Sequence, residues 1–217
     1  LRSVEGALPP NLRLNEEAET DALAAALLHD LGHGPFSHLF EEILPHARHH
    51  EDWTSDILLD PDTDVHAALT GISRGMPDRV VSLLRGRYPL AYLSRSVSGT
   101  LDVDRCDYLL RDSHMTGVRY GIYDLDWLLR ALSFGQTPRG GDGDWVLAIE
   151  GRKGLPPIEG FFLARTFMYQ QVYHHKATRA AEALIRAIFA RLAQLVREGT
   201  PPAPTPPAVI AAATGSP

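Results

Sequence analysis

Apolar residues recur with the spacing of a helix along most of the chain. Residues 22–28 carry no polar side chain, which predicts a buried helix. Asn15 precedes this helix as an N-cap, and Glu16 and Glu17 occupy its first turn, where acids interact favourably with the helix dipole. Further short helices are expected over residues 36–44, 51–59, 65–72, 78–85 and 123–132, separated by breakers such as Pro45 and Gly75-Met76-Pro77.

The pattern changes in the second half of the chain. Residues 135–143 are polar and rich in glycine, Trp145–Ile149 has the composition of a strand, and residues 151–157 again have turn character. A small β-hairpin is therefore expected inside an otherwise helical protein.

The C-terminal part divides into a helical and a non-helical segment. Residues 160–198 predict one long helix or two stacked helices, with Gly199 as the stop. Residues 200–217 are rich in Pro and Ala and predict a tail without a core. The expected fold is mostly α with a minor β-hairpin, and the expected division is a domain over 1–199 and a tail over 200–217.

Composition narrows the functional classes. Hydrophobic residues make up 44% of the chain and charged residues 22%, as in ordinary soluble globular proteins. The formal net charge of -6 argues against a general nucleic-acid or membrane-surface binder, although it is compatible with a local basic pocket. The single cysteine, Cys106, cannot form an internal disulfide, and no run is apolar and long enough to span a membrane. We therefore expect a cytoplasmic protein.

The chain starts at Leu1, without an initiator methionine and without a secretory leader. We therefore expect it to be a piece of a longer protein.

The stretch from Leu27 to His38 concentrates metal-ligand chemistry. His29 and Asp30 end an apolar run, where the pair would be desolvated without a strong partner. Imidazole nitrogen and carboxylate oxygen suit a divalent cation, and Mn, Fe, Zn and Mg all remain candidates. The alternative is a helix C-terminus at which His29 caps carbonyl groups and the following glycines make a turn. The added His33 and His38 weigh against that alternative.

A second group of histidines follows at positions 46, 49 and 50. For His46 and His49 a solvated loop is the preferred interpretation. His50 differs, because it directly precedes the predicted helix over residues 51–59 and would be aimed from the N-terminus of that helix.

A predicted helix over residues 102–114 has one apolar and one charged face. With Asp104 placed at zero, the side chains of four further residues fall between about -20° and +100°, and Cys106, Leu109 and Leu110 fall on the opposite side. The charged face could form a polar binding surface, or it could be the surface of a helix with internal ion pairs. Its members besides Asp104 are Arg105, Tyr108, Arg111 and Asp112.

A similar stripe runs along the predicted helix after residue 160. Its members recur at helical spacing and carry two cations and two phenols, which suits nucleotide phosphate and base contacts as well as it suits an exposed helix face. They are Arg165, Tyr169, Val172, Tyr173 and Lys176.

These motifs together resemble the HD-domain phosphohydrolases, and within them the deoxynucleoside triphosphate triphosphohydrolase branch. The resemblance covers roughly residues 22–180 and rests on four blocks in the expected order. The blocks are His29-Asp-Leu-Gly-His-Gly-Pro-Phe-Ser-His38, His50-Glu51, Asp102-Val-Asp-Arg-Cys-Asp-Tyr108 with Arg111-Asp112, and Arg165 with Tyr173-His-His-Lys176. The first and third blocks carry most of the specificity.

The resemblance implies a metal site at His29, Asp30 and Asp104. The family signature contains a further histidine in a helix upstream of His29, and residues 1–28 contain none. We expect that the preceding helices lie outside this sequence, and the alternative is that this protein has lost the ligand.

The resemblance also implies an active site for phosphoester hydrolysis. It places His33, His38 and His50 around the phosphates, with His38 near Glu41 and His50 beside Glu51, since a carboxylate fixes an imidazole tautomer and raises its basicity. Its implied contacts with phosphate, sugar or base are Arg105, Tyr108, Asp112, Arg165, Tyr173 and Lys176.

The activity implied is metal-dependent hydrolysis of dNTPs to deoxynucleoside and triphosphate, with water attacking the α-phosphorus and His38 or His50 supplying a proton to the leaving 5′ oxygen. Two alternatives remain. One is an HD nucleotidase or phosphodiesterase that acts on another phosphoester, and the other is a catalytically weak nucleotide-binding regulatory module. Members of the family commonly assemble into dimers or larger oligomers, so a homo-oligomer is expected.

Overall fold

The computed structural model describes residues 1, 4–44, 48–137 and 145–215. The chain divides into two compact units. Unit 1 comprises Leu1–His29 and Leu58–Val172, and unit 2 comprises Asp30–Ile57 and Tyr173–Pro217. Pro45, His46 and most of the predicted turn over 135–143 lie outside the described residues.

Helix α1 (Glu16–Leu28) begins unit 1, after two short 3-10 turns at Glu5–Ala7 and Pro10–Leu12. The side chain of Asn15 accepts a hydrogen bond from the Ala18 N–H over 2.7 Å, which confirms the predicted N-cap. Ala25 is fully buried, but Leu23 and Leu27 are 67% and 82% exposed. The expectation of a fully buried helix is therefore wrong, because these leucines lie about 160° around the helix from the face that packs.

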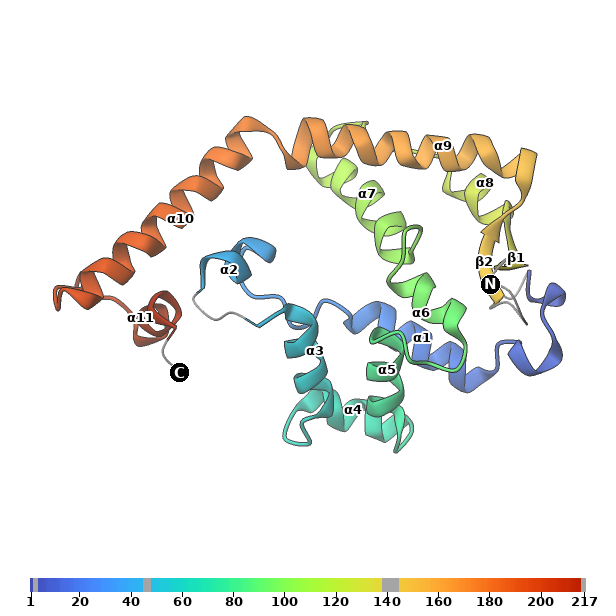
Figure 1. The fold of residues 1–217 in the computed structure, drawn as a ribbon, viewed down its shortest axis with the longest axis horizontal. Coiled ribbons are helices and arrows are strands. Elements are labelled where there is room, and N and C mark those ends of the chain that lie inside the picture. Colours follow the sequence, from blue (N-terminus) through green and yellow to red (C-terminus); the bar gives the residue numbers. More distant parts are fainter. Residues whose placement is uncertain (2–3, 45–47, 138–144, 216–217) are drawn as a thin grey trace. The chain divides into compact units, whose positions relative to one another are not determined.

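The packed face of α1 lies against α5 (Met76–Leu84) and α6 (Ala91–Val97), and α4 (Asp64–Ile72) packs beside α5 (Figure 1). The sequence predicted α4 and α5 closely, whereas α6 had no prediction. The core between these helices contains Ala25, Leu58, Val80, Leu83 and Leu93, each at most 1% exposed.

Helix α7 (Val103–Thr116) begins at Asp102, whose side chain accepts the Arg105 N–H, and ends at Gly117, which has φ 73°. Leu109 is fully buried on its apolar face. Helix α8 (Leu125–Arg130) follows and leads into strand β1 (Leu132–Gln136).

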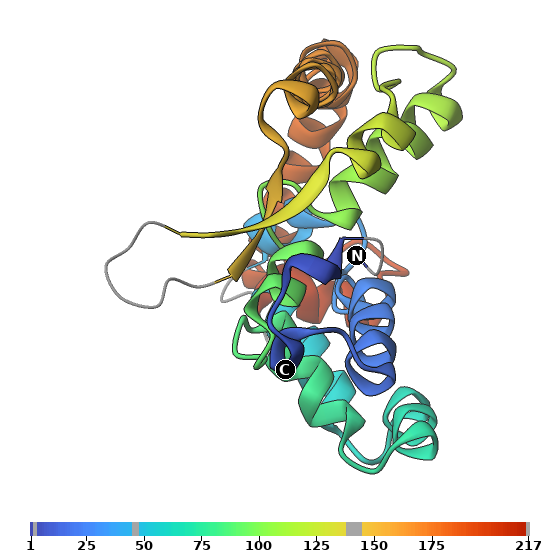
Figure 2. The ribbon, with the colours of Figure 1, turned by 90° about the vertical axis from the view of Figure 1, so that its right-hand side faces the viewer.

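Strand β2 (Trp145–Ile149) pairs antiparallel with β1, with Leu132 opposite Ile149 (Figure 2). The predicted hairpin and the predicted strand over 145–149 are confirmed. Together with the predominance of helices, the hairpin confirms the expected fold class.

Helix α9 (Gly151–Met168) corrects the predicted turn over residues 151–157. Gly154 packs so closely on the hairpin that a Cβ there would lie 2.0 Å from Cγ2 of Ile149. We infer that tertiary packing outweighs the turn preference of the local sequence, including Pro156 and Pro157 inside the helix.

The long helical pattern after residue 160 is interrupted by a π-helical turn at Tyr169–Tyr173. Helix α10 (Lys176–Arg197) begins after it and Gly199 follows with φ 73°. The segment therefore contains two helices, as one of the two predicted alternatives stated.

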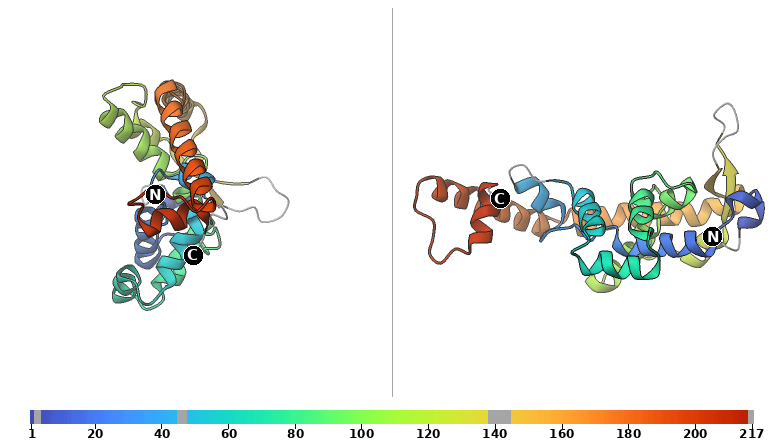
Figure 3. Two further views of the ribbon diagram at one scale, coloured as in Figure 1. Left: turned by 90° about the vertical axis from the view of Figure 1, so that its left-hand side faces the viewer. Right: turned by 90° about the horizontal axis from the view of Figure 1, so that it is seen from below.

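Unit 2 contains α2 (His38–Ile43), the start of α3 (His50–Leu59), α10 and α11 (Pro207–Thr214). Helix α11 lies beside the end of α10, where Ala213 packs against Leu192 and Ala193 (Figure 3). The expected tail thus contains a helix with a small core of its own. Within the described residues, no helix combines the length and the apolar character that crossing a bilayer requires.

Candidate active site

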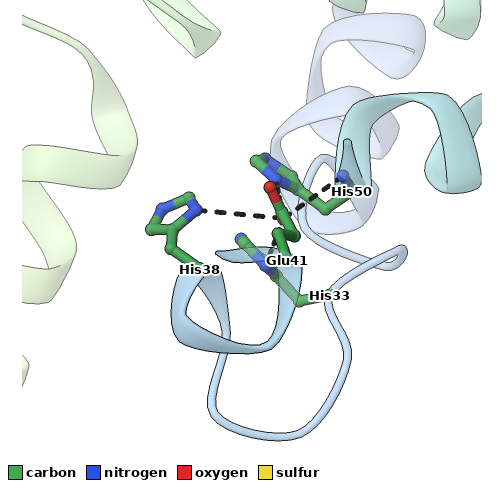
Figure 4. A group of neighbouring side chains, drawn as sticks. All are labelled: His33, His38, Glu41 and His50. Carbon is green, nitrogen blue, oxygen red and sulfur yellow. Dashed lines mark hydrogen bonds and ion pairs between the residues drawn. The ribbon is translucent and has the colours of Figure 1, made fainter. Parts of the chain in front are cut away.

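Three histidines of unit 2 surround one carboxylate (Figure 4). His33 lies in the loop that follows α1, His38 and Glu41 lie on α2, and His50 is the first residue of α3. The spacing of three residues places His38 and Glu41 on one side of α2. Three segments, the loop after α1 and the helices α2 and α3, thus bring together four residues that the sequence predicted for one site.

Glu41 bonds most closely to His50. Its Oε1 atom lies 2.7 Å from Nδ1 of His50 and 3.3 Å from the backbone nitrogen of the same residue. Nδ1 of His33 lies 3.7 Å and Nδ1 of His38 3.9 Å from the same oxygen. The expected partners were His38 for Glu41 and Glu51 for His50. His38 does lie near Glu41, but the shortest contact of Glu41 is with His50, and Glu51 is exposed on α3.

The imidazole rings also contact one another. The rings of His33 and His50 are stacked, with centroids 3.8 Å apart and an interplanar angle of 16°. The His38 ring stands edge-on to both, at 4.9 Å from His33 and 5.2 Å from His50. His38 is 70% exposed at its side chain, whereas His33 and His50 are largely buried.

Burial is the main cause that lowers the pKa of His33, and the neighbouring His50 ring lowers it further. The carboxylates of Asp30 and Glu41 act in the opposite direction. For Glu41, burial works to raise the pKa, but the hydrogen bonds from the ring and backbone of His50 outweigh it and leave the pKa below its usual value. Glu41 is therefore an ionised acceptor, so Nδ1 of His50 carries the proton of their hydrogen bond and Nε2 remains for acid or base chemistry.

Two of the three metal ligands implied by the sequence, His29 and Asp104, lie next to each other. In unit 1, Nε2 of His29 lies 3.5 Å from Oδ1 of Asp104. Nδ1 of His29 lies 3.0 Å from the carbonyl oxygen of Ala26, and since a carbonyl only accepts, this nitrogen carries the proton. Nε2 is therefore the ring nitrogen that lies near Asp104 and could bind a cation.

This pair fits a divalent cation. Two atoms bound at about 2.1 Å to one tetrahedral or octahedral ion lie about 3–3.5 Å apart. A backbone carbonyl that orients the far nitrogen is the usual support of a ligating histidine. Asp30 directly follows His29 in the chain and begins unit 2, where its Oδ1 lies 3.5 Å from Nε2 of His33. The His33, His38, Glu41 and His50 atoms form a second group with a ligand set that could hold an ion.

Two of the predicted substrate contacts meet in unit 1. The phenol of Tyr108 on α7 hydrogen-bonds to Tyr169 and Arg165, and the guanidinium carbon of Arg165 lies 4.6 Å from the centre of the Tyr169 ring. Burial is the first cause that raises the pKa of Tyr108, and Tyr169 raises it further. The phenol therefore stays protonated and can donate a hydrogen bond at neutral pH.

Other predicted contacts on α7 have internal partners. Arg105 forms an ion pair with Asp102 at the start of the helix. Arg111 forms a bidentate ion pair with Asp107 one turn earlier, with distances of 2.7 and 2.8 Å. For Arg111, the alternative of a helix surface with internal ion pairs is correct. Asp112 is partly buried on the same helix.

Tyr173 and Lys176 belong to unit 2. Tyr173 ends the π-helical turn and Lys176 is the exposed first residue of α10. The stripe expected along one continuous helix is therefore wrong as a helical face, because the π-helical turn changes the angular spacing between Arg165 and Lys176.

His49 is a contact that the sequence interpretation missed. Its Nδ1 lies 3.2 Å from Oε2 of Glu41, although its side chain is 81% exposed. The predicted solvated loop is confirmed for His49, which is exposed and lies outside any helix or strand, and only its contact with Glu41 is unpredicted. The available signal was its position next to His50, which the sequence predicted for the same site as Glu41.

Comparisons with known proteins add a family context. Residues 5–111 match the family model of the HD domain. The uncharacterized protein YwfO of Bacillus subtilis is 42% identical over 177 residues, which are 82% of this chain and 38% of that protein. A Dictyostelium discoideum homolog of the deoxynucleoside triphosphate triphosphohydrolase SAMHD1 is 28% identical over 202 residues, 87% of this chain and 36% of that protein.

A solved structure is also similar. The crystal structure of a phosphohydrolase from Bacteroides thetaiotaomicron matches with a TM-score of 0.74 and 33% identity, over 93% of this chain and 45% of that chain. The chain thus spans less than half the length of each of these three proteins.

Proposed function

Because this chain belongs to the HD-domain family, we propose that it is the catalytic part of a metal-dependent phosphohydrolase that acts on nucleotides. The observation that carries the proposal is the Glu41–His50 hydrogen bond inside a group of three imidazoles. An oriented histidine of this kind suits proton transfer to a leaving oxygen.

His29 and Asp104, with Asp30 next to His29 in the chain, are the proposed holders of a divalent cation. When bound, such a cation supplies Lewis-acid activation of a phosphate ester and of water. The mixture of imidazole and carboxylate ligands is compatible with Mn, Fe, Zn and Mg.

The histidine cluster has a separate role in the proposal. Nδ1 of His50 donates its hydrogen bond to the ionised Glu41 carboxylate, so Nε2 is the atom that can carry the proton for the leaving 5′ oxygen. Water adds to the α-phosphorus and loses one proton to the solvent, the bond from phosphorus to the 5′ oxygen breaks as that oxygen takes the proton of His50, and the deoxynucleoside and the intact triphosphate are released. His38 is the alternative donor and is more exposed.

Nucleotide recognition is proposed for the cations and phenols. Arg165 and Tyr108 are already hydrogen-bonded to each other, so they form a pre-arranged pair of donors for phosphate or sugar oxygens. Lys176 and Arg105 would add positive charge, which stabilises phosphates as negative charge builds up on them.

Deoxynucleoside triphosphates are the proposed substrates. The similarity to the Dictyostelium homolog supports this choice, although the more similar Bacillus relative is described as uncharacterized. A different phosphoester is the second candidate, because the cation pair and the histidine cluster would serve other esters equally well.

Product analysis tests the proposal. The metal-free protein is supplied separately with Mn, Fe, Zn or Mg and incubated with each dNTP, and the products are separated by ion-exchange chromatography. Tripolyphosphate together with a deoxynucleoside is the expected result. Orthophosphate or pyrophosphate as the first product would show cleavage of a phosphoanhydride bond and contradict the proposed reaction, and no turnover of any dNTP would favour a different phosphoester. Stoichiometric nucleotide binding without turnover would instead identify a regulatory module.

A further inference from the structure

We propose that Thr54 is a positioning residue of the histidine cluster, and that its hydroxyl group sets the spacing between His33 and His50. The inference rests on the proposed function for its catalytic consequence. Its structural part concerns unit 2 alone and can be tested without turnover.

The contact joins the loop that carries His33 to the helix that carries His50. The backbone N–H of Gly32 donates a hydrogen bond to Oγ1 of Thr54 over 2.9 Å. Thr54 is 1% exposed and Gly32 is partly exposed, so the bond is partly buried. A partly buried donor that loses its acceptor carries part of the cost of desolvation, so this bond helps to fix the position of the loop.

Gly32 allows the two backbones to touch. A Cβ on this residue would lie 2.1 Å from the carbonyl oxygen of His50 and 2.5 Å from the backbone nitrogen of Thr54. Both atoms belong to the helix backbone and cannot move aside as a flexible side chain would. The loop is therefore seated directly on the first turn of α3, and only glycine fits at the contact.

The contact between Gly32 and the first turn of α3 determines how the imidazole rings of His33 and His50 lie relative to each other. His33 follows Gly32 directly, and His50 lies one helical turn before Thr54 on the same side of α3. A shift of the loop relative to the helix would therefore separate the stacked rings of His33 and His50, whose centroids are 3.8 Å apart. It would also move His33 relative to Glu41, which is hydrogen-bonded to His50.

The test compares Thr54→Val with Thr54→Ser in the complete chain. Valine has the shape of threonine without the hydroxyl, whereas serine keeps the hydroxyl and loses a methyl group. Proton–nitrogen correlation spectra of the imidazole rings report the environments of His33 and His50 without any substrate. We expect the signals of both rings to shift in Thr54→Val and to stay near the wild-type positions in Thr54→Ser.

Turnover provides the second measurement. We expect kcat to fall about 10- to 100-fold in Thr54→Val with little change in KM, and Thr54→Ser to retain most of the activity. Unaltered ring signals in Thr54→Val would overturn the inference, as would equal ring shifts in both variants, because equal shifts would assign the effect to packing. If Thr54→Val does not fold, Thr54→Ala replaces it in both measurements. Ring shifts that follow the hydroxyl in a protein without turnover would sustain the positioning role and contradict only the proposed function.

Discussion

Nδ1 of His50 lies 2.7 Å from Oε1 of Glu41, and the backbone N–H of His50 points to the same oxygen over 3.3 Å. One carboxylate oxygen therefore fixes both the ring and the backbone of the residue that begins α3. This double contact orients the proposed proton donor more strictly than the 3.9 Å separation between Glu41 and His38 would.

Replacing Glu41 by glutamine should lower kcat about 100-fold or more, because the neutral amide no longer stabilises the protonated ring of His50. The matched control is Glu42→Gln, since Glu42 is the next residue and forms an exposed ion pair with Arg186 on α10. Steady-state kinetics on a dNTP would measure both variants. Equal rates for the two glutamine variants would exclude Glu41 from the proposed chemistry.

The same variant predicts a dependence of stability on pH. The pKa of Glu41 in the folded protein lies below its ordinary value of 4.5, so the ionised carboxylate stabilises the fold. This contribution is fully present above about pH 4.5 and is lost as the pH falls through the folded-state pKa. Urea unfolding of wild type and Glu41→Gln should therefore show a stability difference at pH 5.5 that shrinks toward pH 3. A constant difference over this range would contradict the ionised pair.

Cation binding should depend on both members of the His29 and Asp104 pair. We expect His29→Ala and Asp104→Asn each to reduce the amount of divalent metal that stays bound after dialysis, measured by plasma mass spectrometry. Asp107→Asn is the matched control on α7, because Asp107 is paired with Arg111 on the exposed surface. Retention of metal at the wild-type level in both pair variants would place the ion elsewhere, for example at the histidine cluster.

The loop between His33 and His38 contains backbone strain. Ser37 has φ 52° and ψ -130°, a conformation that glycine adopts readily and other residues avoid. Ser37→Gly should therefore raise the free energy of unfolding by about 1 kcal/mol, because relief of strain exceeds the added entropy of the unfolded chain. Ser98→Gly serves as the control, since Ser98 has an ordinary extended backbone with φ -136°, and it should lower stability. Urea unfolding measures both, and a loss of stability in Ser37→Gly would contradict the strain.

Local signals explain which parts of the fold were predictable. The N-cap at Asn15 and the strand Trp145–Ile149 depend on neighbouring residues, and both were predicted with close bounds. The first turns of α9 were not, because the close approach of Gly154 to Ile149 is a tertiary contact that overrides turn-forming residues. Helix α11 was missed for a related reason, since Ala213 is buried only by its packing against α10.

In the candidate site, too, features that depend on local sequence were predictable and features that depend on tertiary packing were not. Residue types and spacing identified the histidines and carboxylates, and the spacing of three residues made His38 the obvious partner of Glu41. The closer partner, His50, is nine residues away and reaches Glu41 from a different helix. No periodicity reports such a contact, because it depends on how α2 and α3 pack.

The buried carboxylate of Asp21 should carry a large share of the stability of unit 1. It is fully buried and accepts hydrogen bonds from Arg79 over 2.7 and 3.1 Å and from the Tyr88 hydroxyl over 2.8 Å. Burial is the first cause that raises the pKa of Tyr88, and the hydrogen bond to Asp21 raises it further. The Tyr88 phenol therefore stays protonated and donates its hydrogen bond to Asp21, and Arg79 forms an ion pair with the same side chain.

Asp21→Asn leaves the Arg79 guanidinium with only the exposed carboxylate of Glu17, 3.2 Å away, so we expect a loss of about 3 kcal/mol in the free energy of unfolding, measured with urea. The exposed pair of Asp107 and Arg111 provides the control, and Asp107→Asn should cost about 0.5 kcal/mol or less. Equal losses in the two variants would show that burial adds nothing to the Asp21 network.

Asp21 lies on α1 eight residues before His29, and it anchors that helix to Arg79 on α5. Folded Asp21→Asn should therefore still bind metal, because the His29 ring is oriented by the Ala26 carbonyl and not by Asp21.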